Sequence, residues 1–403
     1  MAKYTLSDFD DIRPYSDGEM QDAFRSLIAD RQFSRVLKGL IPWCPVGLRN
    51  GFLKLMFKGI NSPQDFQVRF MKKVVWYVLK KGATGHSFEY DKSLNKQGAY
   101  TFISNHRDIV LDSAILDYML HCAGFAKTCE IAIGNNLLIY PWIKTLVRMN
   151  KAFVVNRGLT PKETLKSSIH MSKYMHFAIN QKKENIWIAQ REGRAKDSND
   201  LTQESVLKML VLGYENDNEN NNDNENNNDN HNENGNGNEA MNPVAKIIAA
   251  IKDMNLVPLT LSYELDPCDY LKAQEFQLKR DVSGWKKAKQ DDLDNMKIGI
   301  FGKKGHVHFH AAACINDWLD TLDPNTISKA DIYRIIAEHI DHEIHSNYRI
   351  YDINRDAASG KKNDYIEERI KMVKVDNPDV PFLREKISTM YANPLINYEK
   401  ATK

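Results

Sequence analysis

Apolar residues gather in short runs along the middle of the chain. Between residues 98 and 310, helical stretches such as DSAILDYMLHCAG and PKETLKSSIHMSKYMHFAIN separate these runs. Strands that alternate with helices are typical of an α/β protein, so we predict a mostly parallel central sheet flanked by helices. The runs with the length and composition of buried strands are AYTFIS (99–104), CEIAIG (129–134), AFVVN (152–156), NIWIAQ (185–190), LVPLTLSY (256–263) and KIGIFG (297–302). In LVPLTLSY, Pro258 suggests a strand near a bend or an edge.

Helical patterns lie on both sides of this region. Residues 17–82 show helical patterns. Beyond residue 327 the chain is again helical in pattern, with the stretches DIYRIIAEHIDHEIHSNY and DYIEERIKMVKV. We therefore expect an N-terminal helical region (1–82), an α/β domain (83–315) and a C-terminal helical extension (316–403). The Asn-rich acidic tract at 215–239 is almost without apolar residues, and we expect a disordered insertion because burial cannot offset its ordering entropy.

Composition and charge narrow the class of protein. Hydrophobic residues are 42% and charged residues 27%, and no apolar run reaches the roughly 18 residues of a membrane span. The acidic N-terminus does not resemble a signal peptide, and the five cysteines form no CxxC, so we expect a reducing, cytoplasmic location. The acidic tract holds eight negative charges; because the whole chain carries +2, the rest carries +10. A basic surface fits an anionic membrane, an anionic small substrate or nucleic acid.

One basic segment is also strongly apolar. RVLKGLIPWCPVGLRNGFLKLMFKGIN (35–61) mixes Leu, Phe, Trp and Met with Lys38, Arg49, Lys54 and Lys58. Such a segment can lie in a membrane interface, or it can form a helix pair that covers the core.

The stretch SNHRDIVLDSAIL (104–116) contains the letters HRD of a kinase catalytic loop. A kinase requires Asn five residues after the Asp, but Ser113 stands there, and neither DFG nor a preceding GxGxxG is present. We therefore exclude a kinase. His106 can instead act as a general base that Asp108 or Asp112 orients, or the stretch is a polar turn in which Asp108 caps a helix.

Two other predicted strands are followed by cations. AFVVNR ends at Arg157, and REGRAK supplies Arg191, Arg194 and Lys196. Ligands of open α/β sheets bind at the carboxyl ends of strands, where guanidinium groups match phosphate oxygens, so these cations could form a phosphate clamp. The alternative is a set of scattered surface cations.

Histidines recur at regular spacing in two places. GHVHFHA places His306, His308 and His310 on one face of a strand, and EHIDHEIHS places three more along a helix, namely His339, His342 and His345. Either set could bind a metal ion, but neither forms HExxH, and we interpret both as solvated or interface histidines. We assign no metal site.

In their order, the motifs resemble those of the glycerolipid acyltransferase family, the glycerol-3-phosphate and lysophosphatidate acyltransferases. That family has His-x4-Asp, Phe-x-x-Arg, Glu-Gly-x-Arg-Ser and a Val-Pro strand; the similar blocks here are NHRDIVLD, AFVVNR, REGRAK and VPLTLSYE. SYE is similar to the glycerol-3-phosphate branch. The family's Asp falls on Leu111, which leaves Asp112, our preference, or Asp108, and Arg194 directly follows Glu-Gly. These departures indicate a divergent, bacterial-type member.

The resemblance implies a function in phospholipid biosynthesis. His106, assisted by Asp112 or Asp108, would help to move a fatty acyl group from acyl-CoA or acyl-carrier protein to glycerol 3-phosphate or a lysophospholipid, with no metal or other cofactor. Residues implied to bind substrate are Arg157, Glu192, Gly193, Arg194 and Lys196. The expected location is peripheral, on the inner face of the membrane, and no nucleic acid is expected as a partner. The alternatives are a non-catalytic lipid-binding protein on the same fold, or acyl transfer to another acceptor.

Overall fold

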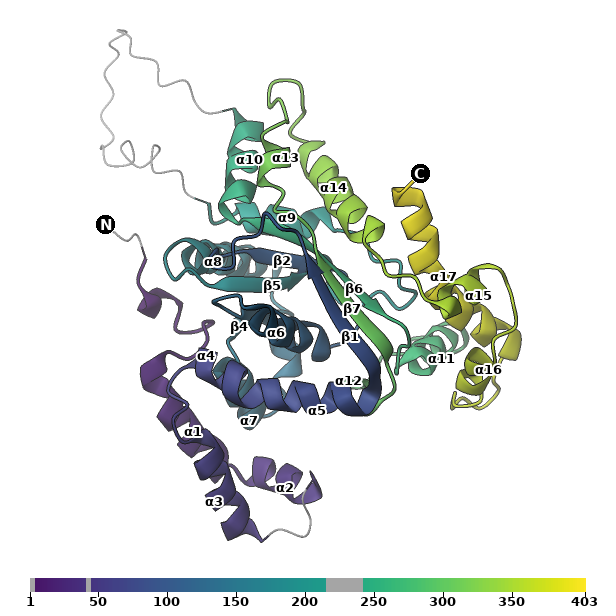
Figure 1. Cartoon of the computed structure of the whole chain (residues 1–403), viewed down its shortest axis with the longest axis horizontal. Helices are drawn as coiled ribbons and strands as arrows, with labels where there is room; N and C mark the ends of the chain where they lie inside the picture. Colours follow the sequence, from purple (N-terminus) through teal and green to yellow (C-terminus); the bar gives the residue numbers. More distant parts are fainter. Residues whose placement is uncertain (1–3, 41–44, 215–241) are drawn as a thin grey trace.

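The computed structural model describes residues 4–40, 45–214 and 242–403. Its centre is a seven-stranded sheet with the strand order β1-β7-β6-β2-β5-β3-β4 (Figure 1). The strands are β1 (Ala83–Tyr90), β2 (Thr101–Ser104), β3 (Cys129–Gly134), β4 (Ala152–Val155), β5 (Asn185–Ala189), β6 (Leu256–Tyr263) and β7 (Gly305–Ala311). Each neighbouring pair is parallel except β6 and β7, which are antiparallel. The predicted α/β class with a mostly parallel sheet flanked by helices is therefore confirmed.

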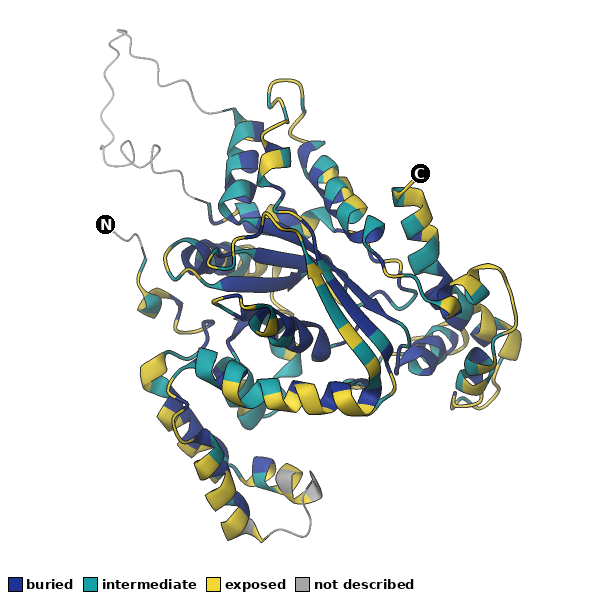
Figure 2. Cartoon of the chain, in the orientation of Figure 1, coloured by how far each residue is buried: buried dark blue, intermediate teal, exposed yellow. Residues whose placement is uncertain are grey.

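Helices cover both faces of this sheet. Because successive strand residues point to opposite faces, Phe102 and Ile103 enter two different cores. The core that contains Phe102 is covered by α5 (Lys72–Gly82) and α6 (Leu111–Ala123). The core that contains Ile103 is covered by α8 (Pro161–Asn180), α9 (Glu204–Val211), α10 (Pro243–Asp253) and α14 (Ile332–Ser346). Figure 2 shows the central strands as buried along their length.

Further helices pack around the two ends of the sheet. At the N-terminal side, a separate aromatic cluster joins α1 (Met20–Ala29), α2 (Arg31–Leu40), α3 (Val46–Phe57), η3 (Phe66–Met71) and α7 (Pro141–Met149). The short elements of this half of the chain are η1 (Leu6–Phe9), η2 (Asp17–Glu19), α4 (Pro63–Asp65) and η4 (Asn135–Leu137). At the C-terminal side lie α11 (Asp269–Asp281), α12 (Lys289–Phe301), α13 (Asn316–Leu319), α15 (Asp352–Ala358), α16 (Asp364–Ile370) and α17 (Val380–Ala401). Among the described helices, none has the length and apolarity needed to cross a bilayer.

Three local expectations from the sequence were wrong. The run KIGIFG is the end of helix α12 and not a strand; Ile298 and Ile300 pack into two different clusters, and short apolar runs do not distinguish strand from helix. Edge strand β1 was missed because its half-exposed residues contain few apolar side chains. Strand β6 is an internal strand and not an edge strand. Pro258 lies just beyond the residues of β6 that pair with β7, and its carbonyl accepts from Ala312 N (2.9 Å). No hydrogen bond to a partner strand is lost there, although proline has no N–H.

The predicted disordered tract at 215–239, and residues 41–44 of the apolar and basic segment, lie outside the described residues.

Candidate active site

The irregular segment between β2 and α6 brings His106 and Asp112 together. His106 Nδ1 lies 2.8 Å from Asp112 Oδ2, and the pair is almost completely shielded from solvent, with side-chain exposures of 15% and 0%. The imidazole also contacts the edge of Trp187, with ring centroids 5.6 Å apart. The irregular segment at 105–110 accommodates the spacing of six residues between the His and the Asp.

Several donors surround the carboxylate of Asp112. Its Oδ2 also accepts from the backbone N–H groups of Arg107 (2.7 Å) and Asp108 (3.0 Å), and its Oδ1 accepts from the Tyr263 hydroxyl (3.0 Å). Burial and the nearby carboxylates raise the pKa of Tyr263 well above its usual value, so the hydroxyl stays a donor. A carboxylate in this position acts as an acceptor, so Nδ1 of His106 carries the proton and Nε2 keeps a free lone pair.

Asp108 has a different place from Asp112. Its Oδ1 accepts from the backbone N–H groups of Val110 (2.9 Å) and Leu111 (2.8 Å), which are unpaired donors at the start of α6. Burial, and then the charge of Asp112, raise the pKa of Asp108, although the two N–H groups oppose that shift. Asp108 is therefore the residue that caps the helix, as one of the two sequence hypotheses proposed.

Asn105 anchors the strand end from which His106 projects. The fully buried Asn105 amide accepts from Leu261 N (2.8 Å) and donates to Leu261 O (3.0 Å), so it continues the pairing of β2 with β6 by one side chain. No sequence motif pointed to a role for this residue. The same is true of Tyr263, although Tyr263 is part of the SYE block.

The predicted substrate-binding residues at the ends of β4 and β5 are only partly brought together. Arg157 Nη1 lies 3.6 Å from Glu192 Oε1, both side chains are open to solvent, and the Arg157 backbone N–H donates to Asn135 Oδ1 (3.1 Å). A Cβ on Gly134 would lie 2.4 Å from Asn136 Oδ1 and 3.1 Å from Arg157 Nε, so glycine at the end of β3 leaves space for both side chains. Gly193 has φ +71°, a left-handed conformation that glycine adopts without strain.

Arg194 and Lys196 differ in their surroundings. Arg194 forms no ion pair with a described residue, and its charge is near enough to lower the pKa of Asp108, against burial. Lys196 instead forms an ion pair with Glu275 of α11, which Lys279 also contacts (3.1 Å). The ammonium of Lys196 is thus already neutralised.

A buried ionic cluster next to the site was missed by the motif analysis. Arg107 is buried; it donates to Ser198 Oγ and its Nη2 lies 3.9 Å from Asp266 Oδ2. Although burial opposes ionisation, Lys272 and Arg107 lower the pKa of Asp266 to about 2. Asp200 is also fully buried, and its pKa is raised by burial against the attraction of Arg107. The R of HRD therefore ties the turn after β2 to the loop after β5.

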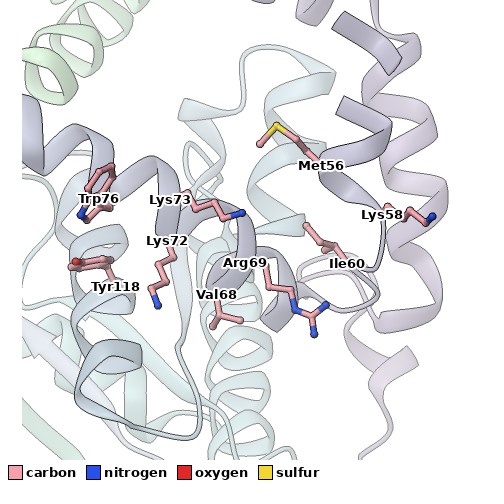
Figure 3. Close-up of a pocket in the computed structure, with 9 residues that line it drawn as sticks. All are labelled: Met56, Lys58, Ile60, Val68, Arg69, Lys72, Lys73, Trp76 and Tyr118. Carbon is pink, nitrogen blue, oxygen red and sulfur yellow. The ribbon is translucent and has the colours of Figure 1, made fainter. Parts of the chain in front are cut away.

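A cavity of about 520 Å³ lies apart from these residues, between the N-terminal helices and the outer side of α6. Figure 3 shows Trp76 and Tyr118 together at one side of it and Lys58 at the other. Its further lining residues are Met56, Ile60, Val68, Arg69, Lys72 and Lys73. None of the predicted site residues lines this basic and partly apolar cavity.

The chain was compared with known proteins. Residues 87–208 match the Acyltransferase family. No curated protein matches the chain. Among solved structures, the chain is similar to the crystal structure of the 1-acyl-sn-glycerophosphate (LPA) acyltransferase PlsC from Thermotoga maritima, with a TM-score of 0.36 and 10% sequence identity, over 80% of this chain and 94% of that chain. The matched range begins in β1, ends in α9 and includes His106, Asp112 and Arg157. The segment 87–208 therefore matches the acyltransferase family that the motifs predicted.

Proposed function

We propose that this chain transfers a fatty acyl group from an acyl thioester, acyl-CoA or acyl-carrier protein, to the hydroxyl of glycerol 3-phosphate or a lysophospholipid. The observation that carries the proposal is the shielded His106–Asp112 pair inside the family-matched region. A His held by a buried carboxylate at the carboxyl end of a strand suits removal of a proton from a hydroxyl.

In this mechanism, His106 Nε2 takes the proton of the acceptor hydroxyl as its oxygen attacks the thioester carbonyl carbon. The carbon–sulfur bond then breaks, and the protonated imidazole returns the proton to the leaving thiolate. The negative charge of Asp112 stabilises the imidazolium in between, and the backbone donors to Asp112 keep that carboxylate in position.

Arg157 and Arg194 are the cations proposed to hold the acceptor's phosphate. Both follow strands whose carboxyl ends lie on the same edge of the sheet as His106, because β2, β5, β3 and β4 are parallel neighbours. The partner of Arg157, Glu192, is 72% exposed and can be displaced by a phosphate at little cost. Lys196 is left out of this clamp because Glu275 already pairs with it.

We further propose that the chain meets its lipid substrates by docking on an anionic membrane through α3 and α5. On α3, Leu48, Phe52 and Leu55 are exposed by 68%, 56% and 67%, and their spacing puts them on one helix face. On α5, Trp76 and Tyr77 are exposed beside Lys80 and Lys81. Exposed apolar and aromatic side chains next to lysines are typical of interfacial helices.

The replacement His106→Ala tests the proposed chemistry. Removal of the base should lower turnover by the roughly 10²–10⁴-fold that general-base catalysis contributes. The measurement is acceptor-dependent thiol release from acyl-CoA or acyl-carrier protein, with the labelled product separated by lipid chromatography for each acceptor.

His170→Ala is the matched control, since His170 lies on α8, outside the candidate site, where it pairs with Asp11 near the N-terminus. If folded His106→Ala protein turns over like the wild type, the assignment of the site is wrong. If wild-type protein binds these lipids but releases no thiol with any acceptor, the chain is a lipid-binding protein on the same fold.

A further inference from the structure

Two histidines of β7 and a glutamate of β1 meet on one face of the sheet. The parallel register pairs His308 with Ser87 and His310 with Glu89, so all four side chains project to the same side. One ligand atom from each of Glu89, His308 and His310 lies within 4.8 Å of the other two. The carboxylate of Glu89 is 3.8 Å from His310 Nδ1.

The third histidine of the sequence motif is not part of this group. His306 Nδ1 lies 3.0 Å from the Tyr351 hydroxyl, one step further along the strand. Glu89 completes the group instead. It lies on β1, so the histidine pattern of β7 alone did not include it. The ligand set is therefore two imidazoles and one carboxylate.

The surroundings of His308 hold its side chain in place, as suits a residue that binds a metal ion. His308 is 4% exposed, and its Nδ1 is 2.8 Å from Ser87 Oγ. When Nδ1 donates to that hydroxyl, Nε2 keeps its lone pair for a metal ion, the arrangement that orients ligating histidines in proteins. The side chain of Glu89, in contrast, is 65% exposed on an edge strand, so it can change its conformation to reach an ion.

The spacing is close to what a tetrahedral ion requires. Zinc binds nitrogen and oxygen ligands at about 2.0–2.2 Å, which places two ligand atoms roughly 3.4 Å from each other. Small side-chain rotations of Glu89 and His310 bridge the difference from 4.8 Å. Asp91 and Glu343 add negative charge near His310, whereas Arg349 adds positive charge near His308.

We propose that Glu89, His308 and His310 form a binding site for a divalent transition-metal ion such as Zn²⁺, with the fourth position left to water. Two imidazoles and a carboxylate are a donor set that Zn²⁺ accepts, and a hard cation such as Mg²⁺ does not favour imidazole. The ion ties edge strand β1 to β7.

This site does not belong to the acyl-transfer machinery. Beside the histidines, Thr260 and Ser262 of β6 bond to the end of α14 and the turn after it. The next residue, Tyr263, points to the other face, where it donates to Asp112. The metal site and His106 thus lie on opposite faces of the sheet.

The test is equilibrium binding of Zn²⁺ to the full chain, after treatment with EDTA and removal of any affinity tag. We expect one Zn²⁺ per chain by calorimetry, and Co²⁺ in its place should give the visible absorption of a tetrahedral site. Glu89→Gln and His310→Ala should each weaken Zn²⁺ binding by at least the roughly 10–100-fold that loss of even an outer-shell partner costs.

Glu89→Gln is the decisive variant, because Glu89 is exposed and its replacement leaves the core intact. His170→Ala, remote from β7, controls for adventitious binding to surface histidines and should keep the wild-type affinity. Absence of stoichiometric binding to the wild-type protein would overturn the proposal, as would an unchanged affinity in both Glu89→Gln and His310→Ala.

Discussion

Asp108 and Asp112 lie four residues apart and differ in the groups that they bind. Asp112 accepts from His106, from two backbone N–H groups and from Tyr263, whereas Asp108 accepts only from the first turn of α6. An Asn side chain can cap a helix as well as Asp does, but it cannot supply the negative charge that stabilises an imidazolium. The same replacement at the two positions therefore separates the two roles.

Asp112→Asn should lower turnover by roughly 10²–10⁴-fold, because the imidazole loses both its fixed tautomer and its stabilising charge. Asp108→Asn should keep near-wild-type turnover, and its free energy of unfolding should change by less than about 1 kcal/mol. Initial rates of acyl transfer and urea denaturation of both variants provide the measurements. Equal losses of turnover in two stably folded variants would argue against this assignment.

At the scale of secondary-structure elements, the loop after β5 is held in position by helices that follow it in the chain by more than a hundred residues. Thr202 donates through its backbone N–H (2.8 Å) and hydroxyl (2.6 Å) to Asp341 of α14. Helix α17 adds bonds from Asn393 to Asp197 O (2.8 Å) and from Asn397 to Asn199 (3.1 Å). The C-terminal helices therefore hold the loop that carries Arg194.

Asp341 gives this contact a pH dependence. Burial is the main cause that raises the pKa of Asp341 from 3.8 to about 6, although Thr202 opposes it. Between pH 3.8 and about 6, Asp341 loses its proton in the unfolded chain but keeps it in the folded chain. The free energy of unfolding therefore falls as the pH rises through this range, and the whole loss is present above about pH 6.

Asp341→Asn should remove this penalty while its amide oxygen still accepts from Thr202. We expect a Tm about 1–3 °C above that of the wild type at neutral pH, and a difference that vanishes as the pH falls below 3.8, where Asp341 is protonated in both states. Thermal unfolding across this pH range is the measurement, with the exposed Asp376→Asn as control. A variant that is less stable than the wild type at neutral pH would contradict the prediction.

At the scale of the whole molecule, the exposed apolar residues of α3 and the basic cavity lie at the same end. The cavity is lined by Met56 of α3 and by residues of α5, and Lys58, Lys72 and Lys73 make it basic (Figure 3). Anionic headgroups would meet the lysines while acyl chains meet the apolar side chains.

The triple replacement of Leu48, Phe52 and Leu55 by Ser tests this docking. It should lower the affinity for phosphatidylglycerol-containing vesicles at least about tenfold, since even partial burial of three large apolar side chains contributes more than ~1.4 kcal/mol. Vesicle co-sedimentation measures the effect, with Leu165→Ser on α8, also exposed, as control. Unchanged binding by the triple variant would mean that Leu48, Phe52 and Leu55 do not dock on the membrane.

Much of the fold was accessible from the sequence alone. Strands covered on both faces must be apolar along their length, so β2 to β6 appear as short apolar runs, and His106, Arg157 and Arg194 follow three of them. The motifs at these strand ends were sufficient to predict the acyltransferase family. Strand β1, whose residues are only half-buried or exposed, lacks that requirement and gives no such signal.

The tertiary structure decided which side chains meet. Asp112 bonds to Tyr263, 151 residues away, and Lys196 pairs with Glu275, 79 residues away. Glu89 of β1 lies beside the histidines of β7. Local periodicity indicates which face of an element is buried, because residues on one face recur at the period of the helix or strand. Contacts between distant residues depend on how the elements pack, and no pattern within a single element records them.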